Sequence, residues 1–147
     1  MLLRTARPDE TGWINEQYAK VRFIPSDPAN ETIVIAELDG LRAGLGRLVD
    51  AGQGAYELGG MFVFDQFRGR GVARAIVDEL IRRAEGRTVY CIPFADLEPI
   101  YAGEGFTTIE PSPDLPERVR EKLAWCAETI DRPVILMVLR DPDFVTT

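Results

Sequence analysis

Short apolar runs bounded by turn-forming residues dominate the first half of the chain. Leu2–Ala6 is predicted as a short strand, and Thr32–Ile35 is a β-branched run typical of a strand. A second apolar stretch ends at Val49, and the Asp39-Gly40 pair between the two runs is typical of a hairpin turn. These positions predict a strand followed by a β-hairpin.

A third strand of this meander is predicted over Tyr56–Phe64, and its interior contains two consecutive glycines. Gly59 and Gly60 supply no side chain to pack, so they weaken a regular strand. Such a pair indicates a β-bulge or a place where the backbone approaches a ligand closely.

Apolar residues recur at helical spacing in three further segments. Val72–Ala84 carries such a stripe and ends before Gly86, a residue that often stops a helix. Pro8–Lys20 and Glu117–Ile130 are also predicted as helices. The remaining predictions are a short helix over Ala95–Gly105 and strands over Thr88–Ile92, Phe106–Glu110 and Pro133–Leu139.

The order of these elements predicts a mixed α/β fold. A strand meander, a helix, a strand, a helix and two closing strands follow one another without linkers, repeats or low-complexity tracts. The 147 residues fit one domain of ordinary size, so a single domain over residues 1–147 is expected.

The composition narrows the possible chemistry. The apolar fraction of 46% and the charged fraction of 28% are typical of an ordered globular protein. The chain has no histidine, which excludes His-dependent catalytic triads and His-ligated metals. Cys91 and Cys126 are too few for a disulfide framework or a four-thiolate zinc site, and they are predicted as small buried residues.

The charge and the hydropathy also restrict the partners. The net charge of −7 argues against general nucleic-acid binding, which usually needs a basic face. No apolar run reaches the ~20 residues that span a bilayer, and the first ten residues lack the apolar core of a signal peptide. We therefore expect a cytoplasmic protein that binds neither nucleic acid nor membranes.

Two glycines and two arginines lie between the third strand and the following helix. In Arg68–Gly71 the glycines let the backbone approach an oxygen closely, and the helix start exposes free N–H groups that suit a phosphate. A P-loop is excluded because no Lys-Ser or Lys-Thr follows Gly71. A dinucleotide fingerprint is excluded because Arg74 takes its third glycine position. The residues alone leave two interpretations, a phosphate-binding turn or a plain strand-to-helix connection.

The wider stretch YELGGMFVFDQFRGRGVARAIVDELI resembles the acetyl-CoA motif of the GNAT superfamily of N-acetyltransferases. That motif places (Gln/Arg)-x-x-Gly-x-(Gly/Ala) between a strand and a helix, and Arg68–Gly71 corresponds to its core. YAGEGF, at Tyr101–Phe106, resembles the family's Tyr-x-x-x-Gly-Phe element, and ELDGLRAGLGRLV resembles its early hairpin. The resemblance covers nearly the whole chain in the family's order, and it favours the phosphate-binding interpretation.

The resemblance implies both a fold and an activity. The fold is α/β (α+β mixed), with a central, twisted, mostly antiparallel sheet of six to seven strands that is flanked by helices and splayed at the fourth and fifth strands. The activity is transfer of an acetyl group from acetyl-CoA to a primary amine of a small molecule, amino-acid-like or polyamine-like, by direct attack in a ternary complex. No metal is expected, and a homodimer is one option. The alternative is a non-catalytic acyl-CoA-binding sensor or interaction module of the same fold.

The resemblance also implies which residues bind acetyl-CoA. The pantetheine arm is expected along Met61–Val63, where a strand N–H near Phe62 would polarise the thioester carbonyl. The diphosphate is expected on backbone N–H groups of the glycine turn and the first helical turn. The complete implied set is Met61, Phe62, Val63, Arg68, Gly69, Arg70, Gly71, Val72 and Ala73.

Two residues are implied as catalytic. Tyr101 falls on the family position near the CoA sulfur, where its hydroxyl would protonate the leaving thiolate, and the other interpretation is an aromatic side chain packed in the core. Glu57 matches a position that serves as general base in some members, directly or through water. The other interpretation of Glu57 is a strand-end carboxylate that faces solvent. Asp96 and Glu98, just past a buried strand, are rival bases.

The acceptor amine is expected beside the early helix and the proline-rich loop, with Trp13, Tyr18 and Arg22 as its contacts. The sequence departs from the family pattern at Phe94, where many members carry an asparagine that contacts CoA. Residues 111–132 are more elaborate than the family minimum, and they are expected to cover the acceptor site or to form a dimer face.

Overall fold

One seven-stranded sheet organises the chain in this computed structural model, which describes residues 1–21, 23–27 and 30–140. The strand order is β1-β2-β3-β4-β5-β7-β6, and every neighbouring pair is antiparallel except β4 and β5, which are parallel. The predicted mixed, mostly antiparallel sheet is therefore confirmed. The strands are β1 Leu2–Thr5, β2 Glu31–Leu38, β3 Leu41–Gly52, β4 Ala55–Val63, β5 Val89–Cys91, β6 Thr107–Ile109 and β7 Leu136–Leu139.

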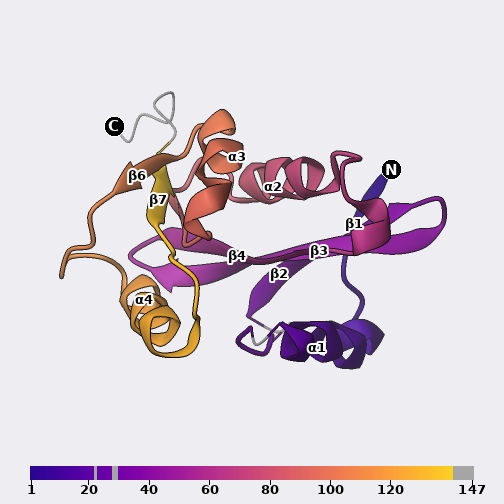
Figure 1. Cartoon of the computed structure of the whole chain (residues 1–147), viewed down its shortest axis with the longest axis horizontal. Helices are drawn as coiled ribbons and strands as arrows, with labels where there is room; N and C mark the ends of the chain where they lie inside the picture. The colour runs from indigo at the N-terminus through magenta and orange to yellow at the C-terminus, as the bar shows by residue number, and fades with distance from the viewer. Residues whose placement is uncertain (22, 28–29, 141–147) are drawn as a thin grey trace.

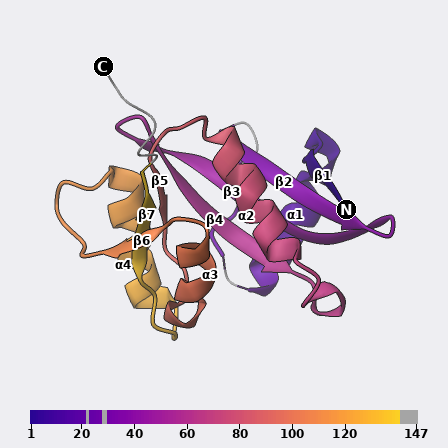
Figure 2. The same cartoon turned by 90° about the horizontal axis from the view of Figure 1, so that it is seen from above.

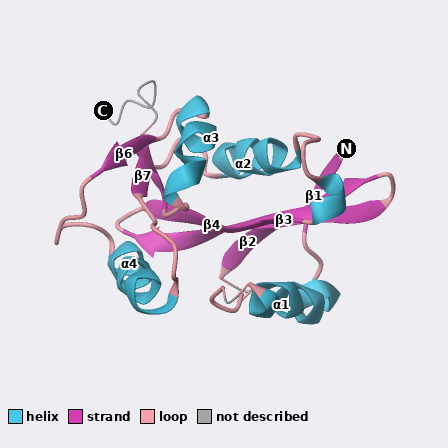
Figure 3. Cartoon of the chain, viewed as in Figure 1, coloured by secondary structure: helices cyan, strands magenta, loops and turns pink. Residues whose placement is uncertain are grey.

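Helices cover both faces of the sheet (Figure 1). The helices α2 and α3 lie on one face, and α1 and α4 lie on the other, as Figure 3 shows with helices in cyan and strands in magenta. Their bounds are α1 Thr11–Lys20, α2 Val72–Arg83, α3 Glu98–Gly103 and α4 Glu117–Thr129. Single 3-10 turns, η1 Pro8–Glu10, η2 Asp65–Phe67 and η3 Ala95–Leu97, precede or connect these elements.

The core is divided by the sheet into clusters that match the helices. Leu48, Leu58, Ile76, Leu80 and Met137 belong to the cluster that joins β3, β4 and β7 to α2. Two smaller clusters pack α4 and α1 against the opposite face. Among the described residues, no helix is long and apolar enough to cross a membrane.

The sheet opens between β4 and β5. Their pairing covers Tyr56–Leu58 against Val89–Cys91 only, although β4 continues to Val63. Figure 2 shows the two strands diverging from their common end. The stretch Gly59–Val63 is thus left without a β5 partner, as expected for a sheet splayed at the fourth and fifth strands.

The predicted bulge lies in this open stretch. The register between β3 and β4 shifts between Leu45 and Arg47, which pair with Phe62 and Gly59. One residue of β3 therefore faces two residues of β4, and Gly60 takes a positive φ of 60° that glycine adopts easily. The bulge turns the backbone of β4 just where the sheet opens.

Candidate active site

A groove of about 930 Å³ is lined by β4, the glycine turn, the start of α2, and α3. Eight of the nine residues implied for acetyl-CoA binding line it, and Arg70 is the exception. The structure therefore brings together Met61, Phe62, Val63, Arg68, Gly69, Gly71, Val72 and Ala73.

The glycine turn presents its backbone to this groove. Gly69 and Gly71 have φ values of 78° and 79°, and a Cβ at either position would find no atom within 4 Å. Gly71 precedes the first residue of α2, and no side chain caps that helix end. The first N–H groups of α2 are available to an external acceptor such as a phosphate, because a helix start leaves them without intrahelical partners.

The two arginines of the turn point to different partners. The Arg68 guanidinium lies 3.0 Å from Asp65 and lines the groove. The Arg70 guanidinium lies 3.4 Å from Asp39, in the turn between β2 and β3. The side chain of Arg70 thus pairs with Asp39 and does not line the groove, so its place in the implied binding set stays a prediction.

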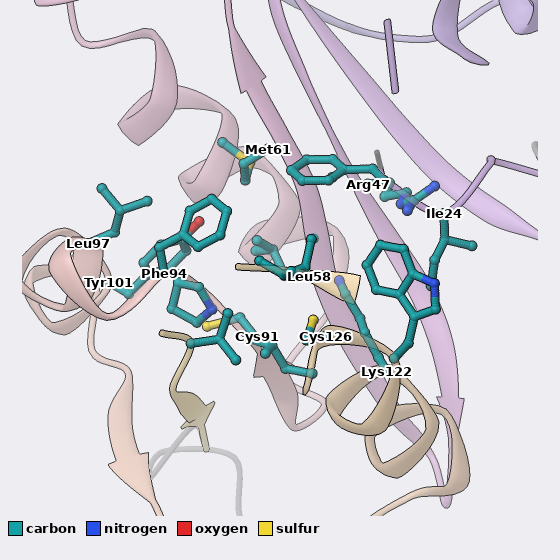
Figure 4. A pocket seen from close by; sticks show the side chains of 18 residues that line it. Ile24, Arg47, Leu58, Met61, Cys91, Phe94, Leu97, Tyr101, Lys122 and Cys126 are labelled. Atoms are coloured by element: carbon teal, nitrogen blue, oxygen red, sulfur yellow. The ribbon is translucent and has the colours of Figure 1, made fainter. Parts of the chain in front are cut away.

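A second, smaller cavity of about 100 Å³ adjoins the groove. It includes Leu58 of β4 and Cys91 of β5, and it therefore lies where the two strands separate. Figure 4 shows Tyr101 at the left of this pocket and Arg47 and Lys122 toward the right. The residues that line both the groove and the cavity are Phe23, Met61, Phe94, Leu97 and Tyr101.

Tyr101 lies where the groove and the cavity, the two hollows of this region, meet. Its side chain is 6% exposed and packs edge-on against Phe106, with ring centroids 5.8 Å apart. Burial raises the pKa of its hydroxyl well above the usual range, so the hydroxyl keeps its proton at neutral pH. The ring packs in the core, as one interpretation predicts, and it also lines both the groove and the cavity, while its catalytic role stays a prediction.

Glu57 is fully buried and does not line either hollow. Lys122 of α4 donates a 2.9 Å hydrogen bond to its Oε2, and Arg118 Nε lies 3.6 Å from Oε1. The interpretation of Glu57 as a solvent-facing carboxylate is wrong, since α4 covers it. Lys122 does line the cavity, so Glu57 can act on a ligand there through Lys122.

The three residues expected beside the acceptor differ in position. Trp13 stacks on the Arg42 guanidinium, 4.2 Å from its ring, and lines neither hollow. Tyr18 is fully buried, and its hydroxyl faces the cavity-lining Gly60. Arg22 lies outside the described residues.

Two cations of the cavity were missed by the sequence analysis. Arg47 of β3 is 1% exposed, and its guanidinium lies over the Tyr18 ring, 4.6 Å from the centroid. The signal was present, because Arg47 occupies the same face of the strand as Leu45 and Val49, both buried. Lys122 similarly lies one turn after the buried Val119 and one turn before the buried Cys126 on α4.

The rival carboxylates lie elsewhere. Asp96 lines the groove and pairs with Arg132 at 2.8 Å, and Arg132 in turn lies 3.7 Å above the Phe94 ring. Glu98 accepts a 2.8 Å hydrogen bond from Thr108 and lines neither hollow. No group of three or more Cys, Asp or Glu side chains suited to a metal ion is found within the described part of the chain.

The insertion contributes directly to the cavity. It includes α4, and Lys122, Trp125, Cys126 and Ile130 all line the pocket. Residues 111–132 therefore form one wall of the cavity that adjoins the groove.

Comparison with protein families assigns most of the chain to a known family. Residues 2–100 match the model described as the acetyltransferase (GNAT) family. No curated protein matches the chain by sequence.

Solved structures share the fold at low sequence identity. Rv2747 from Mycobacterium tuberculosis, in complex with CoA and NLQ, has a TM-score of 0.75 and 21% identity over 96% of this chain and 99% of that one. N-acetylglutamate synthase from Neisseria gonorrhoeae, with coenzyme A and N-acetyl-glutamate, has a TM-score of 0.70 and 18% identity over 95% of this chain and 34% of that one. The ribosomal-protein-S18-alanine N-acetyltransferase from Escherichia coli has a TM-score of 0.66 and 12% identity over 99% of both chains.

Proposed function

The chain belongs to the GNAT family of acetyltransferases, and on that premise we propose that it transfers an acetyl group from acetyl-CoA to the primary amine of a small molecule. The observation that carries this proposal is the junction at Tyr101. A groove with uncapped helix N–H groups, suited to a diphosphate, meets a small cavity suited to an acceptor. Family members need both substrates at one point, and the junction provides it.

The class of acceptor is a small amine, amino-acid-like or polyamine-like. The cavity of about 100 Å³ suits a small molecule. The neisserial N-acetylglutamate synthase was solved with coenzyme A and N-acetyl-glutamate, which supports an amino-acid-like acceptor for a chain of the same fold.

The proposed reaction is direct attack within a ternary complex. The neutral amine nitrogen attacks the thioester carbonyl carbon, the carbon–sulfur bond breaks, and the CoA thiolate takes a proton from the Tyr101 hydroxyl. A backbone N–H of the open stretch of β4, near Phe62, stabilises the negative charge on the carbonyl oxygen. The open edge of β4 also pairs with the pantetheine arm, since β5 leaves it free.

The amine must lose its proton before it attacks. Glu57 is the proposed base, and Lys122 relays the proton because its Nζ lies 2.9 Å from Oε2 and also lines the cavity. Lys122 passes one proton to Glu57 and takes one from the acceptor ammonium. The carboxylate is flanked by two cations, Arg118 and Lys122.

The proposal is tested by two measurements on the purified chain. Acetyl-CoA at a hundredfold excess over its Kd should stabilise the native state by about 2.7 kcal/mol, which is read as a rise in Tm. Incubation with a panel of small amines should release the CoA thiol, detected with a thiol reagent. The absence of both signals would overturn the proposal. A rise in Tm without thiol release from any amine would instead support the non-catalytic acyl-CoA sensor.

A further inference from the structure

Polar side-chain atoms from α1, β3, β4 and α4 lie close to Gly59 and Gly60 of β4. A Cβ at Gly59 would lie 2.4 Å from Lys122 Nζ and from Glu57 Oε2. A Cβ at Gly60 would lie 2.5 Å from the Tyr18 hydroxyl and 2.9 Å from Arg47 Nε. Both glycines line the cavity together with Arg47 and Lys122, and the Tyr18 hydroxyl packs against Gly60 without lining the cavity itself.

Two of these atoms have no hydrogen-bond partner among the described residues. They are the Tyr18 hydroxyl and Arg47 Nε, and their side chains are 0% and 1% exposed. Arg47 is otherwise held in place, because Nη1 donates a 2.7 Å hydrogen bond to Ser26 and lies 3.5 Å from Glu31. An unpaired polar group that is buried costs about 1–3 kcal/mol, so a ligand acceptor at this point would recover free energy.

The charges around this point favour an anion. The cations are Arg47, Lys122 and Arg118, and the carboxylates that contact them are Glu31 and Glu57, which leaves one positive charge in excess. A guanidinium is suited to a carboxylate, to which it donates charge-assisted hydrogen bonds. An ammonium group at the same place would be repelled by Arg47.

The rest of the cavity is largely apolar. Phe23, Ile24, Trp125, Ile130 and Val134 form much of its wall. The favoured ligand therefore has one acidic group and an uncharged body.

We propose that the acceptor is an α-amino acid whose carboxylate is bound by Arg47 Nε and the Tyr18 hydroxyl. The inference rests on the proposed acetyltransferase function and narrows its substrate class, excluding polyamines. Gly59 and Gly60 are consecutive, with Cα atoms ~3.8 Å apart, so the carboxylate site and the Lys122–Glu57 pair are near enough for the two ends of one α-amino acid. The amine then lies on the Lys122 side, where it is neutral at attack because Lys122 and Glu57 have taken its proton by the proposed relay.

The first experiment compares acids with matched neutral amines. Thiol release from acetyl-CoA is measured with the α-amino acids, with their primary amides, and with putrescine and spermidine. At least one amino acid should show a kcat/KM about 10–100-fold above that of its amide, the loss expected for one charge-assisted hydrogen bond. The amide's amine loses its proton more readily, so chemistry alone would favour the amide.

The second experiment assigns the preference to residues. Arg47→Met and Tyr18→Phe should each raise KM for the amino acid and reduce its advantage over the amide, and Tyr18→Phe retains the packed ring. Arg42→Met is the matched control, because Arg42 lies on the same strand and contacts buried Glu10 at 3.1 Å but lines neither hollow. The control should keep the advantage of the amino acid.

The outcomes separate this inference from the proposed function. Thiol release that favours amides or polyamines, or an acid preference unchanged in both cavity variants, overturns the carboxylate site while acetyl transfer stands. If no amine releases thiol, N-acetyl amino acids are added to the CoA-saturated protein and Tm is recorded. A rise in Tm that Tyr18→Phe abolishes supports the site, and no rise with any of them overturns it.

Discussion

Buried polar residues of this chain differ in how completely their hydrogen bonds are met. Glu10 is 2% exposed, and its carboxylate accepts hydrogen bonds from Arg4 at 2.7 and 2.9 Å and from the Arg7 N–H at 2.9 Å. Tyr18 and Arg47 are as deeply buried, yet each keeps an unpaired donor beside the cavity. A buried cluster whose hydrogen bonds are all made holds elements together, whereas buried donors without a partner can bind a ligand.

Substitutions of Tyr101, the proposed acid, and of Glu57, the proposed base, should affect catalysis in different ways. Tyr101→Phe removes one hydroxyl and keeps the ring against Phe106, so kcat should fall by about 10²-fold with little change in acetyl-CoA affinity. Glu57→Gln should lower activity at neutral pH and recover it at alkaline pH, where the amine loses its proton unaided. The pH profiles of kcat/KM for both variants, measured where chemistry limits turnover, check the two roles.

Tyr90→Phe is the control for the loss of a buried hydroxyl. Tyr90 is 8% exposed on β5 and lines neither hollow, so its variant should retain the kcat of the unmodified chain. A Tyr101→Phe enzyme that matches Tyr90→Phe would remove Tyr101 from the mechanism. A Glu57→Gln enzyme reduced by one factor at every pH would show a structural role for the carboxylate.

From the sequence, single residues of the site could be predicted only where they belong to a recognisable motif. Tyr101 and the glycine turn belong to ordered sequence elements, and the structure places them on one continuous surface. Arg47 and Lys122 come from separate elements, β3 and α4, and meet only because both face the opening at Gly59 and Gly60. Such a meeting depends on the packing of α4, which periodicity alone does not determine.

At the scale of elements, turn chemistry accounts for the successful predictions. Asp39-Gly40 forms the hairpin turn between β2 and β3, and both residues take the positive φ that this turn needs. The residues AGQGA at Ala51–Ala55 are by themselves typical of a loop, yet β3 and β4 extend to a two-residue turn at Gln53-Gly54. The glycines and Gln53 of this stretch are the reason that the sequence alone does not predict the pairing at the strand ends.

The glycine turn before α2 makes a prediction about acetyl-CoA binding. Gly71→Ala adds a methyl group to the groove-lining turn before α2, where the diphosphate is proposed to bind, so acetyl-CoA should raise Tm by much less than it does in the unmodified chain. Gly40→Ala is the matched control, because Gly40 has nearly the same φ, 77°, and similarly open surroundings, and it does not line the groove. Both variants pay a similar backbone strain, so each Tm shift is taken from the variant's own ligand-free Tm. Equal shifts in the two variants would contradict the diphosphate site.

At the scale of the whole molecule, the splayed sheet determines where chemistry can occur. The parallel pair β4–β5 ends after three residue pairs, and the opening it leaves joins the groove on one face to the cavity that α4 closes. The resemblance to the GNAT superfamily predicted this splayed sheet, whereas the order of strands and helices alone predicted only a mixed α/β fold. The side chains that line the opening come from helices on both faces of the sheet, and the order of elements in the sequence does not predict which side chains meet there.

The buried cluster around Glu10 predicts how the fold responds to acid. It ties β1 to the start of α1 and to β3, through Arg4 and Arg42. The hydrogen bonds from Arg4 lower the pKa of the Glu10 carboxyl from 4.5 to about 2. A carboxyl whose pKa is lower in the folded state stabilises the fold fully above the unfolded value, and that contribution is lost as pH falls from about 4.5 toward 2.

Glu10→Gln should therefore lower the free energy of unfolding by about 3 kcal/mol at pH 7, since the shift from 4.5 to about 2 corresponds to ~1.4 kcal/mol per pKa unit. By pH 3 more than half of this difference should be gone, because the unfolded chain of the unmodified protein is then largely protonated at this position. Urea unfolding at both pH values measures the difference. Glu37→Gln is the control, since Glu37 contacts the same Arg4 at 3.1 Å from a more exposed position and should cost less than about 1 kcal/mol. A Glu10→Gln penalty that stays constant from pH 7 to pH 3 would contradict the lowered pKa and leave packing as its cause.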